Sequence, residues 1–213
     1  MPEFRTEPLI SPLSSGLLPE DERTRRAALT SFRPENSSAA VPTQEVVCYE
    51  CGRISEVPTA ALSANCIHCH AHLSMADVEL KPGSHRLTVR TLGNVTVPQD
   101  TVLSHLNITC GNMTIHGRVS GALRCAKTLR FCNSMRVEGA VKAAKLVVDK
   151  DAEVVLSEGA TVKEATVSGR LTGEITAKGK IIVTRGGELV SLCSAEEIVV
   201  EPGGRYFGAP GTM

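Results

Sequence analysis

The chain has 213 residues, and its 23 Lys and Arg balance 23 Asp and Glu, so its formal net charge is zero. A neutral chain has no overall electrostatic attraction for nucleic acid or for an anionic membrane. Aromatic residues make up only 3% of the sequence and Trp is absent, which argues against grooves that stack bases or sugars.

The first residues carry mixed charge with no apolar block behind them, so they do not resemble a signal peptide. No apolar run approaches the length of a transmembrane helix. We therefore expect a cytoplasmic protein, whose eight cysteines are reduced thiols or metal ligands rather than disulfides.

Residues 1–43 are rich in Pro, Ser, Glu and Arg and show no sustained apolar period. This composition predicts a disordered tail that acts as a tether. Residues 20–29 could form a short helix, but its apolar face is too thin for a membrane-binding amphipathic helix.

Residues 44–74 form a block rich in cysteine and histidine. Cys48 and Cys51 form one Cys-x-x-Cys pair, and Cys66 and Cys69 form a second pair, separated from the first by 14 residues. This spacing is typical of the two knuckles of a zinc ribbon, which supply four thiolates to a structural zinc ion. Redox dithiols and chance spacing are the alternatives. Because a block of this size has no adequate core, the metal would supply most of its folding energy, on the order of 10 kcal/mol.

Four thiolates leave no open coordination position, which argues against hydrolytic zinc chemistry. His68, His70 and His72 lie beside the second pair, and we expect them to be exposed or to lie behind the ligands, although one could replace a cysteine. Arg53 is the only Lys or Arg of the block. A protein-docking or structural role is therefore favoured over nucleic-acid binding.

Residues 76–209 consist of short alternating apolar runs broken by Gly and polar pairs. Residues 119–125 recur at 137–143, 171–177 and 189–195, which indicates a repeat of 17 to 18 residues. A second apolar pair follows each copy: Leu129/Phe131, Leu146/Val148, Ile181/Val183 and Ile198/Val200. The copy expected near Val154 is degenerate, and the register before Met113 is left undefined.

Alternation with period two predicts strands with one buried face, and a repeat this short cannot hold a helix. One repeat therefore fits one coil of three short strands, and the whole region fits about seven coils of a parallel β-helix. An irregular β-sandwich is the alternative, which a fixed interval disfavours. Cys110, Cys125, Cys132 and Cys193 have no pairing motif, and we expect Cys125 and Cys193 to fill small buried positions.

The pattern in residues 117–121, 137–139, 169–177 and 203–208 resembles the bactofilin core. This resemblance covers about residues 80–209. It implies a right-handed β-helix, a polymer-forming role in the bacterial cytoskeleton, and assembly without nucleotide. The cysteine block is a departure, because the minimal bactofilin lacks it.

A solenoid without caps presents unpaired strands at its ends. Tyr206 and Phe207, two of the six aromatic residues of the chain, fall in the last coil. We expect them to form a polymer interface with a second copy of the chain, the alternative being that Phe207 fills the last interior layer.

These observations together predict a non-enzymatic scaffold, a homopolymer with a zinc-binding docking module. One alternative is an adaptor that binds nucleic acid or protein through the ribbon and is oligomerised by the solenoid. The other is a β-helical acyltransferase. The latter would show a strict six-residue repeat and a catalytic His, whereas His85, His105 and His116 have no carboxylate partner in the sequence pattern.

Overall fold

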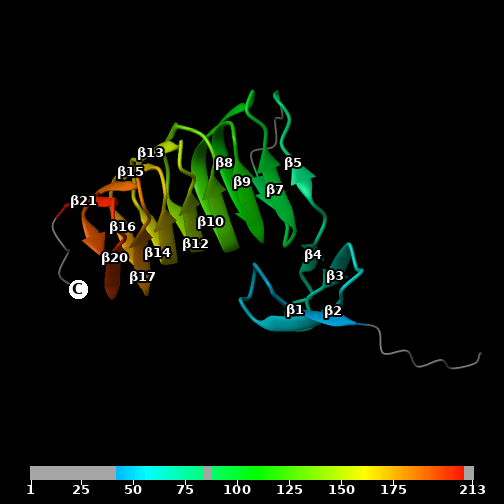
Figure 1. Cartoon of the computed structure of the whole chain (residues 1–213). Coiled ribbons are helices and arrows are strands. Elements are labelled where there is room, and N and C mark those ends of the chain that lie inside the picture. The colour runs from blue at the N-terminus through cyan, green and yellow to red at the C-terminus, as the bar shows by residue number, and fades with distance from the viewer. Residues whose placement is uncertain (1–41, 84–87, 209–213) are drawn as a thin grey trace, which may run out of the picture. The chain divides into compact units, whose positions relative to one another are not determined.

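Every second side chain along most strands is apolar and turns inward, so the strands wind into a stack of coils. The protein is described by a computed structural model over residues 42–83 and 88–208. It confirms the expected all-β class: a parallel β-solenoid of about seven turns, with no helix in the described ranges (Figure 1). The tail expected at residues 1–43 lies almost wholly outside these ranges.

Each coil of the solenoid has up to three faces. The first face carries β6 (Thr88–Arg90), β8 (Val102–Cys110), β10 (Arg118–Phe131), β12 (Val141–Val148), β14 (Ala160–Val167), β16 (Ile175–Ala177) and β19 (Cys193–Ser194). The long strands β10, β12 and β14 bend onto the second face. There they join β5 (Val78–Glu79), β7 (Asn94–Val97), β9 (Asn112–Ile115), β17 (Lys180–Val183) and β20 (Glu197–Val200).

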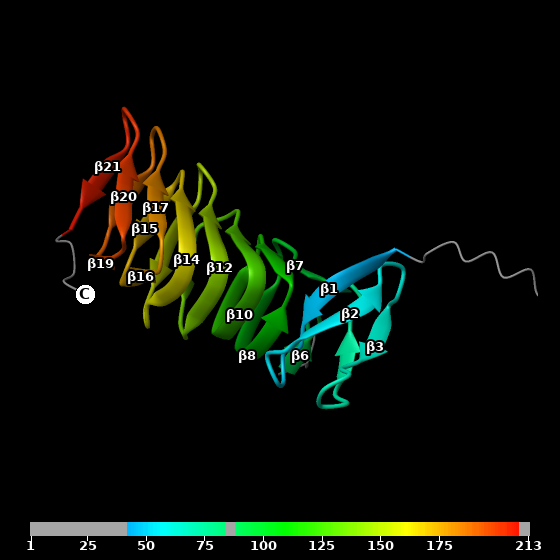
Figure 2. The same ribbon diagram turned by 90° about the horizontal axis from the view of Figure 1, so that it is seen from below.

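A separate five-stranded sheet forms the third face. It consists of β11 (Met135–Val137), β13 (Glu153–Leu156), β15 (Arg170–Thr172), β18 (Glu188–Val190) and β21 (Arg205–Phe207). All strand pairs of the solenoid are parallel, and Figure 2 shows β8, β10, β12 and β14 side by side along the stack. Each strand therefore donates and accepts its backbone hydrogen bonds with the coils before and after it.

Stacked aliphatic side chains fill the interior. Leu129, Leu146, Ala165 and Ile181 follow one another in register on the second face, one in each coil, and all are buried. Phe131 is the largest fully buried side chain. These ladders leave little room for aromatic rings, which accounts for the scarcity of Phe, Tyr and Trp.

The coils are less equal than the sequence repeat suggests. Val141 pairs with Ala160, nineteen residues on, and Ala160 pairs with Ile175, only fifteen residues further. The copy near Val154, degenerate in sequence, is a complete coil in which Val154 pairs with Met135. Turns of different length absorb these differences, so that the inward face of every strand stays apolar.

The cysteines of the solenoid are mostly interior residues. Cys125 pairs with Ala143 and is buried, as expected for a small core position. Cys193 is buried as well, but it pairs with Ile175 and thus takes a larger apolar position. Cys110 is buried and Cys132 is half-buried.

Two antiparallel hairpins precede the solenoid. The first is β1 (Thr43–Val47) with β2 (Ile54–Pro58), and the second is β3 (Ser63–Asn65) with β4 (His72–Ser74). Contacts place them in one compact unit with the solenoid. No helix long and apolar enough to cross a bilayer occurs in the ranges that the structure describes.

Candidate metal centre and the last coil of the solenoid

Each Cys-x-x-Cys pair lies in the turn of one hairpin. In the first turn the amide of Gly52 donates to the carbonyl of Cys48, and in the second the amide of His70 donates to the carbonyl of Cys66, both at 2.9 Å. Gly52 and His70 have φ angles of 70° and 59°, a left-handed conformation that suits glycine and that histidine tolerates. The two turns therefore have the same backbone geometry, the knuckle predicted from the spacing.

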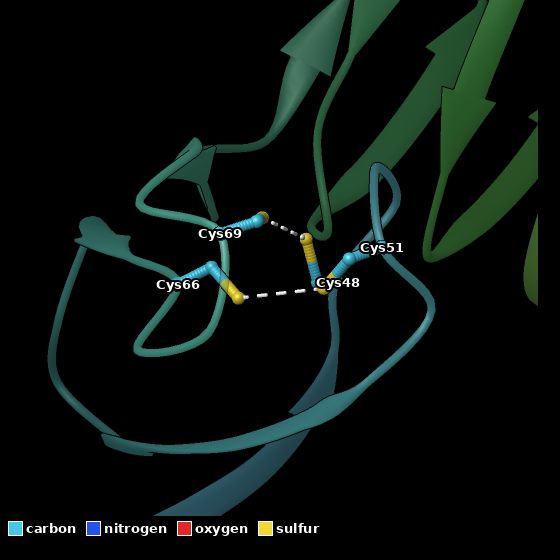
Figure 3. Close-up of side chains that lie close together, drawn as sticks. All are labelled: Cys48, Cys51, Cys66 and Cys69. Atoms are coloured by element: carbon cyan, nitrogen blue, oxygen red, sulfur yellow. Dashed lines mark hydrogen bonds between the residues drawn. The ribbon is translucent and has the colours of Figure 1, made fainter.

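The two knuckles bring the four sulfur atoms of Cys48, Cys51, Cys66 and Cys69 together (Figure 3), all within 4.8 Å of one another. The Sγ atoms of Cys48 and Cys69 are 3.7 Å apart, as are those of Cys51 and Cys66. A tetrahedral ion with metal–sulfur bonds of about 2.3 Å holds its sulfurs about 3.8 Å apart. The cluster therefore has the size and the donor set to hold one such metal ion.

Backbone amides favour a thiolate at this site. The amides of Cys69 and His68 lower the pKa of Cys66 to about 5. The amide of Ala71 acts in the same direction on Cys69, but desolvation and the neighbouring sulfurs outweigh it and raise the pKa of Cys69 to about 12. Four thiolates repel one another when no cation is present, and a bound cation removes this repulsion.

Polar groups around the cluster contact its sulfur atoms and help to orient them. The amide of Glu50 donates to the sulfur of Cys48 at 3.4 Å, and the buried Ser55 hydroxyl lies 3.6 Å from the sulfur of Cys66. The Tyr49 hydroxyl donates to the carbonyl of His72 and so joins the two hairpins. Sequence reasoning did not find Ser55. The sequence feature that could have indicated Ser55 is its inward place in the alternation of β2, between the exposed Ile54 and Glu56.

Among the residues that the structure describes, the sulfur cluster contains no histidine. His68, His70 and His72 are exposed, and the Nε2 atom of His68 lies 3.1 Å from the carbonyl oxygen of Ile54. Of the histidines considered for catalysis, His105 and His116 are exposed, and His85 lies outside the described residues.

The two hairpins over residues 43–74, called the cysteine module below, expose many large apolar side chains for so short a segment. Four large aliphatic side chains are at least half exposed: Val47 at 50%, Ile54 at 56%, Leu62 at 74% and Ile67 at 67%. Arg53 is exposed and is the only Arg or Lys of this segment. A surface of this kind suits contact with a protein better than contact with a polyanion.

The last coil leaves interior side chains uncovered. Ile198 and Val200 continue the ladders of Ile181 and Val183, yet Val200 is 42% exposed whereas Val183 is fully buried. Tyr206 pairs with Leu189 and packs against the core, whereas Phe207 is 51% exposed. Tyr206 therefore occupies the last interior layer, the place considered for Phe207. Ile198 and Val200, recognised in the sequence only as repeat positions, belong to the same open layer.

Comparisons with known proteins agree with this architecture. Residues 75–157 match the family model described as Bactofilin: polymer-forming cytoskeletal. The match runs from the start of the solenoid to β13 and leaves the cysteine module outside. Comparisons with curated proteins and with solved structures gave no significant match.

Proposed function

The chain carries a bactofilin domain, the type described as polymer-forming and cytoskeletal, over residues 75–157, and from this premise we propose a non-enzymatic cytoplasmic scaffold. Copies of the chain assemble end to end into polymers, and no nucleotide is needed. The family match is the observation that carries this proposal. The cysteine module is the docking head of the scaffold.

The last coil supports end-to-end assembly. Val199, Val200 and Phe207 together expose apolar side chains beside those edges of β20 and β21 that pair with no described strand. A second copy placed on this layer would bury that surface and pair those backbone groups, both of which favour association. Tyr206 and Phe207 are the proposed contact residues.

Electron microscopy of the negatively stained full-length protein tests the assembly. We expect filaments whose abundance is the same with and without ATP or GTP. The variant Phe207→Arg should sediment as small species, whereas Val102→Arg, at an exposed apolar position in β8, should still form filaments. Filaments of undiminished length from Phe207→Arg would contradict the interface.

For the docking head, we propose that Cys48, Cys51, Cys66 and Cys69 hold a structural zinc ion. The sulfur separations of 3.7 Å support this choice, since thiolates in a tetrahedron are the preferred ligands of zinc. The zinc holds the two hairpins together and so presents Ile54 and Ile67 to a protein partner. Metal analysis of the purified protein should give one zinc per chain, and none in a variant lacking Cys48 and Cys66.

A second candidate function is an adaptor that binds its partner through the cysteine module, while the solenoid joins a few copies of the chain into a small oligomer. The exposed aliphatic side chains of the cysteine module favour it. The two proposals differ in the size of the assembly. Uniform small oligomers in the micrographs would favour the adaptor, and long filaments would favour the scaffold.

A further inference from the structure

A row of basic side chains follows the first face of the solenoid near its bend. Arg124 pairs in register with Lys142 on the next coil. Lys163 and Lys178 follow on the two coils after that, beside the buried Val162 and Ala177, which pair with each other. All four basic side chains are exposed.

These residues line one groove. It has a volume of about 500 Å³, and the small side chains of Ala126 and Ala144 contribute to its lining between the longer basic ones. No Asp or Glu lines it. Tyr49 of the first knuckle also contributes to the lining. A groove with small apolar residues between cationic side chains fits a ligand that carries both apolar and negatively charged groups.

The neighbouring face shows that this charge pattern is not general. There, Lys145 pairs with Glu164, and Lys180 pairs with Glu197, so that each cation lies beside an anion of the next coil. In the part of the chain that the structure describes, no ion pair involves Arg124, Lys142, Lys163 or Lys178. The positive charge of the groove is therefore available to a partner.

The size of the row indicates the kind of partner. Coils are about 4.8 Å apart, so four consecutive coils span about 15 Å, the length of four or five residues of extended polypeptide. A nucleic acid would profit from aromatic side chains for stacking, and Tyr49 is the only aromatic residue that lines the groove. We propose that this groove binds an extended acidic peptide segment of a partner protein, with carboxylates on the basic row and small apolar side chains between them.

Lys142 also lines a second, smaller hollow with Glu158 and Glu174. These carboxylates partly neutralise its charge, so the test uses the other three basic residues. The probe is a fluorescein-labelled octapeptide of alternating glutamate and alanine, and its binding is followed by fluorescence anisotropy. We expect the triple variant R124E/K163E/K178E of the full chain to bind it at least about tenfold more weakly.

The matched control is K145E/K150E/K180E, which changes the net charge by the same amount at exposed lysines outside the groove. It should bind the octapeptide within about twofold of the unchanged protein. If the reversal variant melts at a lower temperature than the unchanged protein, R124Q/K163Q/K178Q replaces it, because this variant removes the three positive charges without adding negative ones. The same order of affinities is expected. Equal weakening by both sets of variants would overturn the proposal.

An oligothymidylate with the same number of negative charges forms the second arm of the test. Binding of this oligonucleotide as tight as that of the peptide, and lost in the same variant, would also overturn the proposal in favour of a nucleic-acid site. The inference does not depend on polymerisation. Micrographs of R124E/K163E/K178E should show normal filaments, so failure of the groove and failure of the scaffold are separate results.

Discussion

Cysteine plays opposite parts in the two regions of this molecule. In the hairpins, four sulfurs converge, and amides lower the pKa of Cys66 to about 5. In the solenoid, the sulfurs of Cys110 and Cys125 are stacked 3.3 Å apart, and their contact together with burial raises the pKa of the Cys125 thiol. The first region gathers sulfurs that could ligate a metal ion as thiolates, and the second uses sulfur as a small apolar group.

The difference reflects how much core each region can bury. The buried cluster of the hairpins holds only Cys48, Cys66 and Leu73, whereas the buried residues of the solenoid form one continuous cluster along its whole length. A small module without a core needs an external source of stability, and the proposed metal ion is such a source. A long stack of coils needs none, because each layer covers the next.

The largest expected effect is the unfolding of the hairpin region while the solenoid stays folded. Cys48→Ala removes one of the four proposed ligands, and with it most of the metal's expected contribution to folding, on the order of 10 kcal/mol. Hydrogen exchange should then become fast in residues 42–74 and stay slow in the solenoid. Cys132→Ala, at a half-buried cysteine outside the cluster, should leave both regions protected, and loss of protection throughout the solenoid would refute this division.

The second-largest expected effect is a loss of solenoid stability when its largest interior side chain, Phe131, is truncated. Phe131→Ala should destabilise the solenoid by about 3–5 kcal/mol, because it leaves a cavity in a close-packed interior. Thermal melting measures the loss, and the zinc content should not change. The neighbouring Arg130→Ala removes an exposed ion pair with Asp149 and should cost at most about 1 kcal/mol.

A smaller effect sharpens the contrast between the two kinds of cysteine. Cys125→Ala should cost only about 1 kcal/mol, because Ala143 already occupies the next position of the same ladder. Cys125→Ser should cost more, about 1–3 kcal/mol, since it buries a hydroxyl among apolar side chains. Denaturant unfolding measures both. Equal and severe losses would mean that the Cys110–Cys125 contact has a role beyond packing.

The smallest effect concerns the histidines beside the cysteine cluster. His68→Ala removes an exposed hydrogen bond to the carbonyl of Ile54 and should change stability by about 0.5 kcal/mol. Zinc retention in a competition with a chelator should stay within about threefold of the unchanged protein. Complete loss of zinc would make His68 a ligand and displace one of the four cysteines.

Much of this architecture could be predicted because its signals are local. The spacing of the Cys-x-x-Cys pairs predicts the knuckles, and the pairing of Leu123 with Val141 and of Leu171 with Leu189 confirms the repeat. The complete coil at Val154 could not be identified, because turns of unequal length hide its period. Nothing in the order of the residues distinguishes Tyr206 from Phe207 as the interior side chain, since that depends on where the last turn ends.

The basic groove was also beyond sequence reasoning. Arg124, Lys142, Lys163 and Lys178 are spread along a chain with equal numbers of acidic and basic residues. The register pairs Arg124 with Lys142, and the fold brings Lys163 and Lys178 to the same groove. The acids Glu164 and Glu197 fall on the next face. A neutral net charge can therefore conceal a charged surface when a repeat sorts charges by face.

The unequal coils have a consequence for how the chain folds. Each new coil pairs only with residues fifteen to nineteen positions earlier, so every step closes a short loop of nearly constant entropy cost. Folding can then proceed one coil at a time, each finished coil acting as the template for the next, even during synthesis on the ribosome. Because the turns differ in length from coil to coil, we expect a strand that pairs one coil too far along to form fewer matched hydrogen bonds than the correctly paired strand.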